Sequence, residues 1–60
     1  MPVITAEVLS LPKETRAKYA KELTQITSHY TGISEDKITV FIKENSPENV
    51  AAGGVLLSDM

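Results

Sequence analysis

Apolar and polar positions alternate in two stretches of the chain that lie about 30 residues apart. Residues 3–9 are apolar at every even position, and residues 38–44 repeat the same two-residue period. Alternation of this kind predicts β-strands with one buried face. The apolar faces of the two predicted strands consist of Ile4, Ala6, Val8, Ile38, Val40 and Ile42.

Between the strands, the pattern changes to helical spacing over residues 13–31. Pro12 fits a first helical turn, where its missing N–H would have no partner anyway. Gly32 is a natural residue just past the end of a helix. Steps of four, three and four residues predict one apolar stripe along the helix. This stripe is made of Tyr19, Leu23, Ile26 and Tyr30.

The order strand, helix, strand predicts a parallel pair of strands with a right-handed crossover. The helix would cover the face that carries the even-numbered side chains. Val3, Leu9 and Phe41 would then lie on an uncovered face, although parallel sheets are almost always covered on both faces. The uncovered face therefore indicates contact with partner subunits.

The C-terminal part of the chain reads as a turn followed by an arm. Residues 46–49 predict a capped turn with proline at its first position. Residues 50–57 form an apolar tail that two glycines interrupt, which indicates a small hairpin or an extended arm. The expected fold class is α+β: a single domain over residues 1–60, built as a βαβ subunit with a C-terminal hairpin or arm.

Composition makes oligomerisation the expected source of stability. A 60-residue chain buries only a marginal core, and the usual aids are disulfides, a metal or association. This chain has no cysteine and one histidine, which leaves association. Its net charge of −2, with both signs interspersed, does not fit a nucleic-acid binder. We expect no membrane span and no signal peptide, and hence a cytoplasmic location.

Most candidate groups for chemistry have a simpler structural reading. No phosphate-binding loop, catalytic triad or metal-ligand spacing is present. The glycines at 53–54 read as a turn. His29 lacks a carboxylate at helical spacing and reads as a surface residue, and a lone Glu7 is usually a surface or interface charge. Lys13 and Arg16 lie near the start of the predicted helix, where anions bind readily.

Pro2 is the residue that we expect to carry out chemistry. Removal of Met1 is the normal outcome when the second residue is as small as proline, and it would leave Pro2 with a free secondary amine. An α-amine has an ordinary pKa of about 8, and apolar surroundings lower that pKa because desolvation disfavours the charged form. A neutral amine near the working pH is a good general base. The simpler reading is that Pro2 only opens the first strand.

A set of segments in a fixed order resembles the short-chain 4-oxalocrotonate tautomerase family. The resemblance covers nearly the whole chain, and the ordered set is specific although each motif alone is weak. The matching segments are Met1-Pro2-Val3-Ile4-Thr5, Glu14-Thr15-Arg16, Leu23-Thr24, Ile38-Thr39-Val40-Phe41-Ile42-Lys43-Glu44-Asn45, Ser46-Pro47-Glu48-Asn49-Val50 and Gly53-Gly54.

This resemblance implies a homohexamer assembled as a trimer of dimers, with no cofactor and no metal. It implies that Pro2 moves a proton between two carbons of a small enol or 2-oxo acid. It also implies that the hairpin arm completes a neighbour's active site. In the family, two arginines hold the substrate oxygens, and an aromatic residue lowers the pKa of the proline.

The chain departs from the family at each of these helper positions. The residues at 11–12 stand where the first arginine is expected, Thr39 where the second is expected, and Val50 at the aromatic position. Thr39, Val50 and Lys13 are therefore the candidate substrate-binding residues. Arg16, or Lys43 from a neighbour, could also replace a missing arginine. Val50 keeps the pocket apolar.

Three hypotheses about function follow from these observations. The first is a cofactor-free keto–enol tautomerase that uses Pro2 as its acid–base. The second keeps the site but changes the reaction to hydration, dehalogenation or decarboxylation. The third is a non-catalytic oligomeric protein, in which the missing arginines mark a lost activity.

Overall fold

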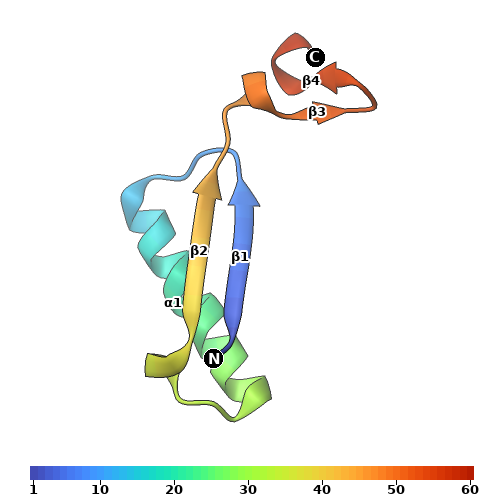
Figure 1. Cartoon of the computed structure of the whole chain (residues 1–60). Helices are drawn as coiled ribbons and strands as arrows, with labels where there is room; N and C mark the ends of the chain where they lie inside the picture. The colour runs from blue at the N-terminus through green and yellow to red at the C-terminus, as the bar shows by residue number, and fades with distance from the viewer.

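Two parallel strands with one helix packed across their rear face form the body of the subunit (Figure 1). The computed structural model describes all residues from 1 to 60. The helix and strands are β1 (Val3–Val8), α1 (Lys13–Thr31), β2 (Thr39–Glu44), β3 (Ala51–Ala52) and β4 (Val55–Leu56). Short 3-10 helices lie at η1 (Glu35–Lys37), η2 (Pro47–Asn49) and η3 (Leu57–Asp59).

The bounds of α1 agree with the sequence prediction at both ends. Pro12, however, precedes the helix as its N-cap with a ψ of 150°, so it does not lie inside the first turn. Its carbonyl still accepts the first helical hydrogen bond, from Arg16 N–H at 2.9 Å. At the other end, Gly32 takes a φ of 72° and donates its N–H to the carbonyl of Ser28. No helix in the structure combines the length and apolarity needed to cross a membrane.

The strands pair in parallel, with Val3 opposite Thr39 and Val8 opposite Glu44. This confirms the predicted parallel pair. Each strand is one residue shorter than predicted, since residues 9 and 38 lie outside the ladder. Ile38 is excluded because its N–H bonds to the carbonyl of Glu35, at 3.1 Å, and so closes η1.

The helix covers the predicted face of the sheet, but the predicted stripe is only partly correct. Leu23 is half-buried against the strands, whereas Ile26 is 54% exposed and Tyr30 is 79% exposed. Toward the end of α1 the side facing the body instead carries Thr27 and Ser28, which are half-buried. The hydroxyl of Ser28 donates to the carbonyl of Ile33 at 2.7 Å. Two strands are too narrow to cover the whole apolar stripe.

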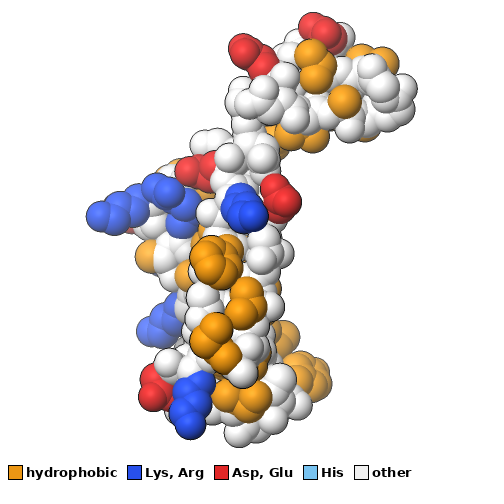
Figure 2. Space-filling view, viewed as in Figure 1, with side chains coloured by type: hydrophobic (Ala, Val, Ile, Leu, Met, Phe, Trp, Pro, Cys, Tyr) orange, Lys and Arg blue, Asp and Glu red, His pale blue; other side chains and the backbone are white.

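A single subunit has no buried core. None of its 60 residues is buried, and it measures 43 × 24 × 13 Å. Its radius of gyration is 14.4 Å, against about 10 Å for a compact chain of this length. Figure 2 shows apolar side chains along the front of the strands, on the face opposite the helix. On the strands and just past β1, the large exposed ones are Val3 (50%), Leu9 (48%) and Phe41 (51%).

The chain after β2 forms an arm that projects beyond the body, with the predicted hairpin at its tip (Figure 1). The hydroxyl of Ser46 accepts a hydrogen bond from Glu48 N–H at 3.3 Å and caps η2. Gly53 and Gly54 have φ values of 61° and 83°, as the two central residues of a type I′ turn require. Leu57 N–H donates to the carbonyl of Val50 at 2.8 Å, which closes the arm on itself.

Candidate functional site

Pro2 and Thr39 meet where the two parallel strands begin. The N–H of Thr39 donates to the carbonyl of Pro2 at 3.1 Å, just before the strand ladder starts. The Thr39 hydroxyl lies 4.0 Å from the sulfur of Met1. Pro2 itself is half-buried. Two of the predicted site residues therefore lie side by side within one subunit.

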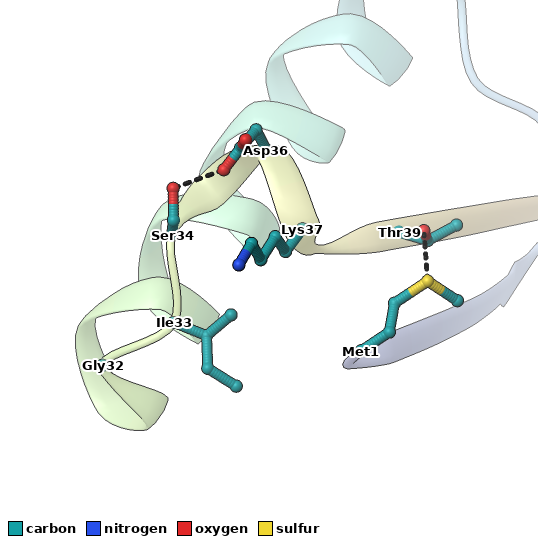
Figure 3. A pocket seen from close by; sticks show the side chains of 7 residues that line it. All are labelled: Met1, Gly32, Ile33, Ser34, Asp36, Lys37 and Thr39. Carbon is teal, nitrogen blue, oxygen red and sulfur yellow. Dashed lines mark hydrogen bonds between the residues drawn. The ribbon is translucent and has the colours of Figure 1, made fainter.

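An open hollow of about 670 Å³ lies beside this strand end (Figure 3). Its lining comes from the start of the chain, the turn after α1 and the start of β2. The lining residues are Met1, Gly32, Ile33, Ser34, Asp36, Lys37 and Thr39. Met1, which is bonded to the nitrogen of Pro2, lines the hollow, whereas Pro2 itself is not among the lining residues.

Lys37 is the only basic residue in this lining. Its side chain forms no ion pair, since the single ion pair of the chain joins Arg16 to Glu44. The acidic neighbour Asp36 accepts a hydrogen bond from the hydroxyl of Ser34. In Figure 3 the Asp36 carboxylate is turned toward Ser34 and away from Met1. Lys37 is therefore the one cationic side chain in the lining, and it is unpaired.

The other predicted binding residues lie at the opposite end of the strands. Lys13 begins α1 just after β1 ends, and Val50 lies at the root of the arm after β2. A six-residue strand spans about 20 Å, so neither residue is near Pro2 of the same subunit. Val50 lines a separate hollow of about 520 Å³, together with Glu7 and Asn45. A site that combined Pro2 with Val50 or Lys13 would need a second copy of the chain.

Two of the alternative candidates have structural partners. Arg16 Nη1 lies 3.2 Å from Glu44 Oε1, and the other Glu44 oxygen accepts the N–H of Leu11 at 2.9 Å. Glu44 therefore ties the loop before α1 to the end of β2. Asn45 Nδ2 donates to Glu7 Oε1 at 3.1 Å. Arg16 and Glu7 thus support the local structure.

His29 lies exposed in the last turn of α1, with its ring 5.0 Å from the ring of Tyr30 in an edge-on arrangement. No carboxylate contacts it, in agreement with its reading as a surface residue. No three His, Cys, Asp or Glu side chains lie close enough together to hold a metal ion.

The sequence analysis did not identify Lys37 as a candidate residue. The missing information was the strand register, because the pairing of Val3 with Thr39 brings the residues just before β2 next to the start of the chain. The one available signal was the position of Lys37, two residues before the candidate Thr39.

Known proteins are similar to this chain over nearly its whole length. Residues 2–60 match a family described as tautomerase enzyme. A probable tautomerase of Bacillus cereus is 40% identical over 60 residues, which cover 98% of both chains. The 2-hydroxymuconate tautomerase of Bacillus subtilis is 36% identical over 61 residues, covering 100% of this chain and 98% of the other.

Solved structures match over almost the whole chain as well. YwhB, a homologue of 4-oxalocrotonate tautomerase, superposes with a TM-score of 0.93 at 35% identity, covering 98% of both chains. TTHB242, another such homologue, gives a TM-score of 0.90 at 31% identity, covering 100% of this chain and 97% of the other. These matches confirm the predicted α+β class and the βαβ arrangement.

Proposed function

Since the chain belongs to the tautomerase family, we propose that it is a cofactor-free keto–enol tautomerase acting on a small enol or 2-oxo acid. Pro2, freed by removal of Met1, is its general acid–base. The observation that supports this proposal is that Met1, the residue bonded to the Pro2 nitrogen, lies in the lining of the hollow. Removal of Met1 would leave a secondary amine at the wall of that hollow.

The proposed reaction only relocates one proton. The neutral Pro2 nitrogen accepts the hydroxyl proton of the enol, and the electron pair of the O–H bond stays on the oxygen of the resulting enolate. This oxygen pair then forms the carbonyl π bond as the electron pair of the carbon–carbon double bond takes a proton at the adjacent carbon from the protonated nitrogen. The amine returns to its neutral form, so no cofactor is consumed. Proline holds this nitrogen on a rigid ring, which fixes its direction.

We also propose that the active form is a homo-oligomer, a hexamer built as a trimer of dimers. The absence of any buried residue in one subunit supports association, as does the exposed apolar face that carries Val3 and Phe41. In such an assembly the arm of one copy, with Val50 at its root, would reach the Pro2 hollow of another. The apolar Val50 would help to keep the amine neutral.

The direct test is a tautomerisation assay on phenylpyruvate and 2-hydroxymuconate with purified protein of known N-terminal mass. We expect turnover of phenylpyruvate, and weaker turnover of the dicarboxylate 2-hydroxymuconate, since both family arginine positions hold other residues. Loss of two charge-assisted contacts should lower kcat/KM for a dicarboxylate by several orders of magnitude. No turnover of either compound by protein that lacks Met1 would contradict the proposal.

The pH profile should show a base that works in its neutral form. Protonation of the Pro2 amine removes the base, so kcat/KM should fall about tenfold per pH unit below the amine's pKa. The ordinary α-amine pKa is about 8, and apolar surroundings lower it. We therefore expect a single ascending limb with its midpoint at or below about pH 8. Steady-state rates between pH 5 and 9 measure this limb, and a flat profile across that range would exclude Pro2 as the base.

The absence of arginine at residues 11–12 and at Thr39 favours a second candidate reaction at the Pro2 nitrogen. Pro2 could then serve hydration, dehalogenation or decarboxylation of an acid. A substrate screen with product identification separates these reactions from tautomerisation. Protein without activity in any of them, but with a native oligomeric state, would fit the non-catalytic reading.

A further inference from the structure

The hollow beside Pro2 has a feature that proton transfer alone does not use. Of the six basic residues in the chain, only Lys37 lines this hollow. Lys37 ends η1, and its backbone N–H is held by the carbonyl of Ser34 at 3.0 Å. Two residues later, Thr39 N–H holds the carbonyl of Pro2. The backbone therefore fixes the stem of Lys37 close to the start of the chain.

The ammonium group of Lys37 is available to a ligand. It takes part in no ion pair and donates no hydrogen bond within the subunit. The carboxylate of Asp36, in the same lining, accepts a hydrogen bond from the Ser34 hydroxyl and is turned away from Met1 (Figure 3). The hydroxyl of Thr39 adds a neutral donor to the same lining, where it contacts only the sulfur of Met1.

Lys37 and Thr39 line the same hollow, so an ammonium group and a hydroxyl are both available there to a carboxylate. Hydrogen bonds between ionised partners are about twice as strong as neutral ones. Lysine acts as a point charge and lacks the two-pronged geometry of arginine. The lining has one lysine, so it offers a cationic side chain to one substrate carboxylate. A second carboxylate would have no cation in this hollow.

We infer that Lys37 binds the substrate carboxylate, with Thr39 as its neutral partner, and that the substrate class is a 2-oxo acid or enol with a single carboxylate. This inference rests on the proposed function, because it assumes that Pro2 works on a ligand in this hollow. It also assigns the role of the missing arginines to a residue outside both family arginine positions.

The test compares an acid with its neutral ester. For phenylpyruvate, Lys37→Gln should lower kcat/KM about 10- to 100-fold, mainly through a higher KM. For the methyl ester of phenylpyruvate, which lacks the charge, the same variant should change kcat/KM less than about twofold. Lys37→Arg keeps the positive charge and should recover most of the loss on the acid.

Three other lysine variants control this comparison. Lys21→Gln removes an exposed helix charge that lines no hollow, and it should leave both substrates unaffected. Lys13→Gln and Lys43→Gln test the other candidate cations, which would have to come from a neighbouring copy. An acid-specific loss in either of these two, with Lys37→Gln like wild type, would overturn the inference.

Binding without turnover separates this inference from the proposed function. Phenylacetate is an unreactive monocarboxylate, and its dissociation constant can be followed by NMR titration of the wild type and of Lys37→Gln. At least tenfold weaker binding to the variant supports the role of Lys37, even if the protein turns over no substrate. Equal binding to both proteins overturns that role, even if the tautomerase assay succeeds.

Discussion

Replacing Pro2 with alanine is expected to lower kcat/KM for enol tautomerisation about 100-fold or more, the usual contribution of a general acid–base group. Alanine also leaves a free α-amine, but this amine is primary and rotates freely, so it loses the fixed direction that the proline ring gives. The fold should not change, because Pro2 forms its hydrogen bond through its backbone carbonyl, which accepts from the N–H of Thr39. Steady-state kinetics on phenylpyruvate, with circular dichroism of both proteins, measure the effect.

A second protein controls for the amine itself. An N-terminal extension that ends in a protease site places the Pro2 nitrogen in an amide, which cannot accept a proton. This extended protein should be inactive, and cleavage that exposes Pro2 should restore activity. Intact mass before and after cleavage confirms the chain start. Equal rates for the wild type, Pro2→Ala and the extended protein would exclude Pro2 from the reaction.

Placing a charge on the uncovered sheet face should have the largest effect on structure. Phe41 is 51% exposed in the subunit, and burying the remainder of such a ring contributes about 2–3 kcal/mol per subunit. Phe41→Glu loses this contribution and places a carboxylate in an apolar contact. Since one copy has no buried residue, we expect the variant to be both monomeric and largely unfolded.

Light scattering and far-ultraviolet circular dichroism, measured on the same samples, report the two effects. Gln25→Glu is the matched control, because Gln25 is exposed on α1 and the change adds a carboxylate of the same kind. It should leave both the mass and the helical signal as in the wild type. A folded monomer of Phe41→Glu would show that a single subunit is stable without association.

The local structure of this chain is largely predictable because strong signals bound each element. Pro12 and Gly32 limit the helix by the backbone conformations they allow, and the predicted bounds agree with α1. The two alternating stretches predicted the bounds of both strands to within one residue of those in the structure. The glycine pair at 53–54 predicted the hairpin, because few other residues accept positive φ at two successive positions.

Features that depend on which surfaces meet were not predictable in the same way. Ile26 and Tyr30 have the spacing of a core stripe, yet both are exposed, because periodicity does not give the width of the sheet beneath. Lys37 was overlooked since only the strand register shows that it lies beside the start of the chain. Pro2 could be put forward as a candidate because the chemistry proposed for it depends on its place in the sequence.

Within one subunit, the hollow beside Pro2 and the hollow that holds Val50 lie at opposite ends of the strands. If each reaction centre joins one end of a subunit to the other end of its neighbour, a damaged subunit impairs different centres according to which end is changed. Two inactive variants, one altered at each end, can then regain partial activity when they are unfolded together and refolded as a mixture. A mixed assembly would contain some centres in which both contributing ends are intact.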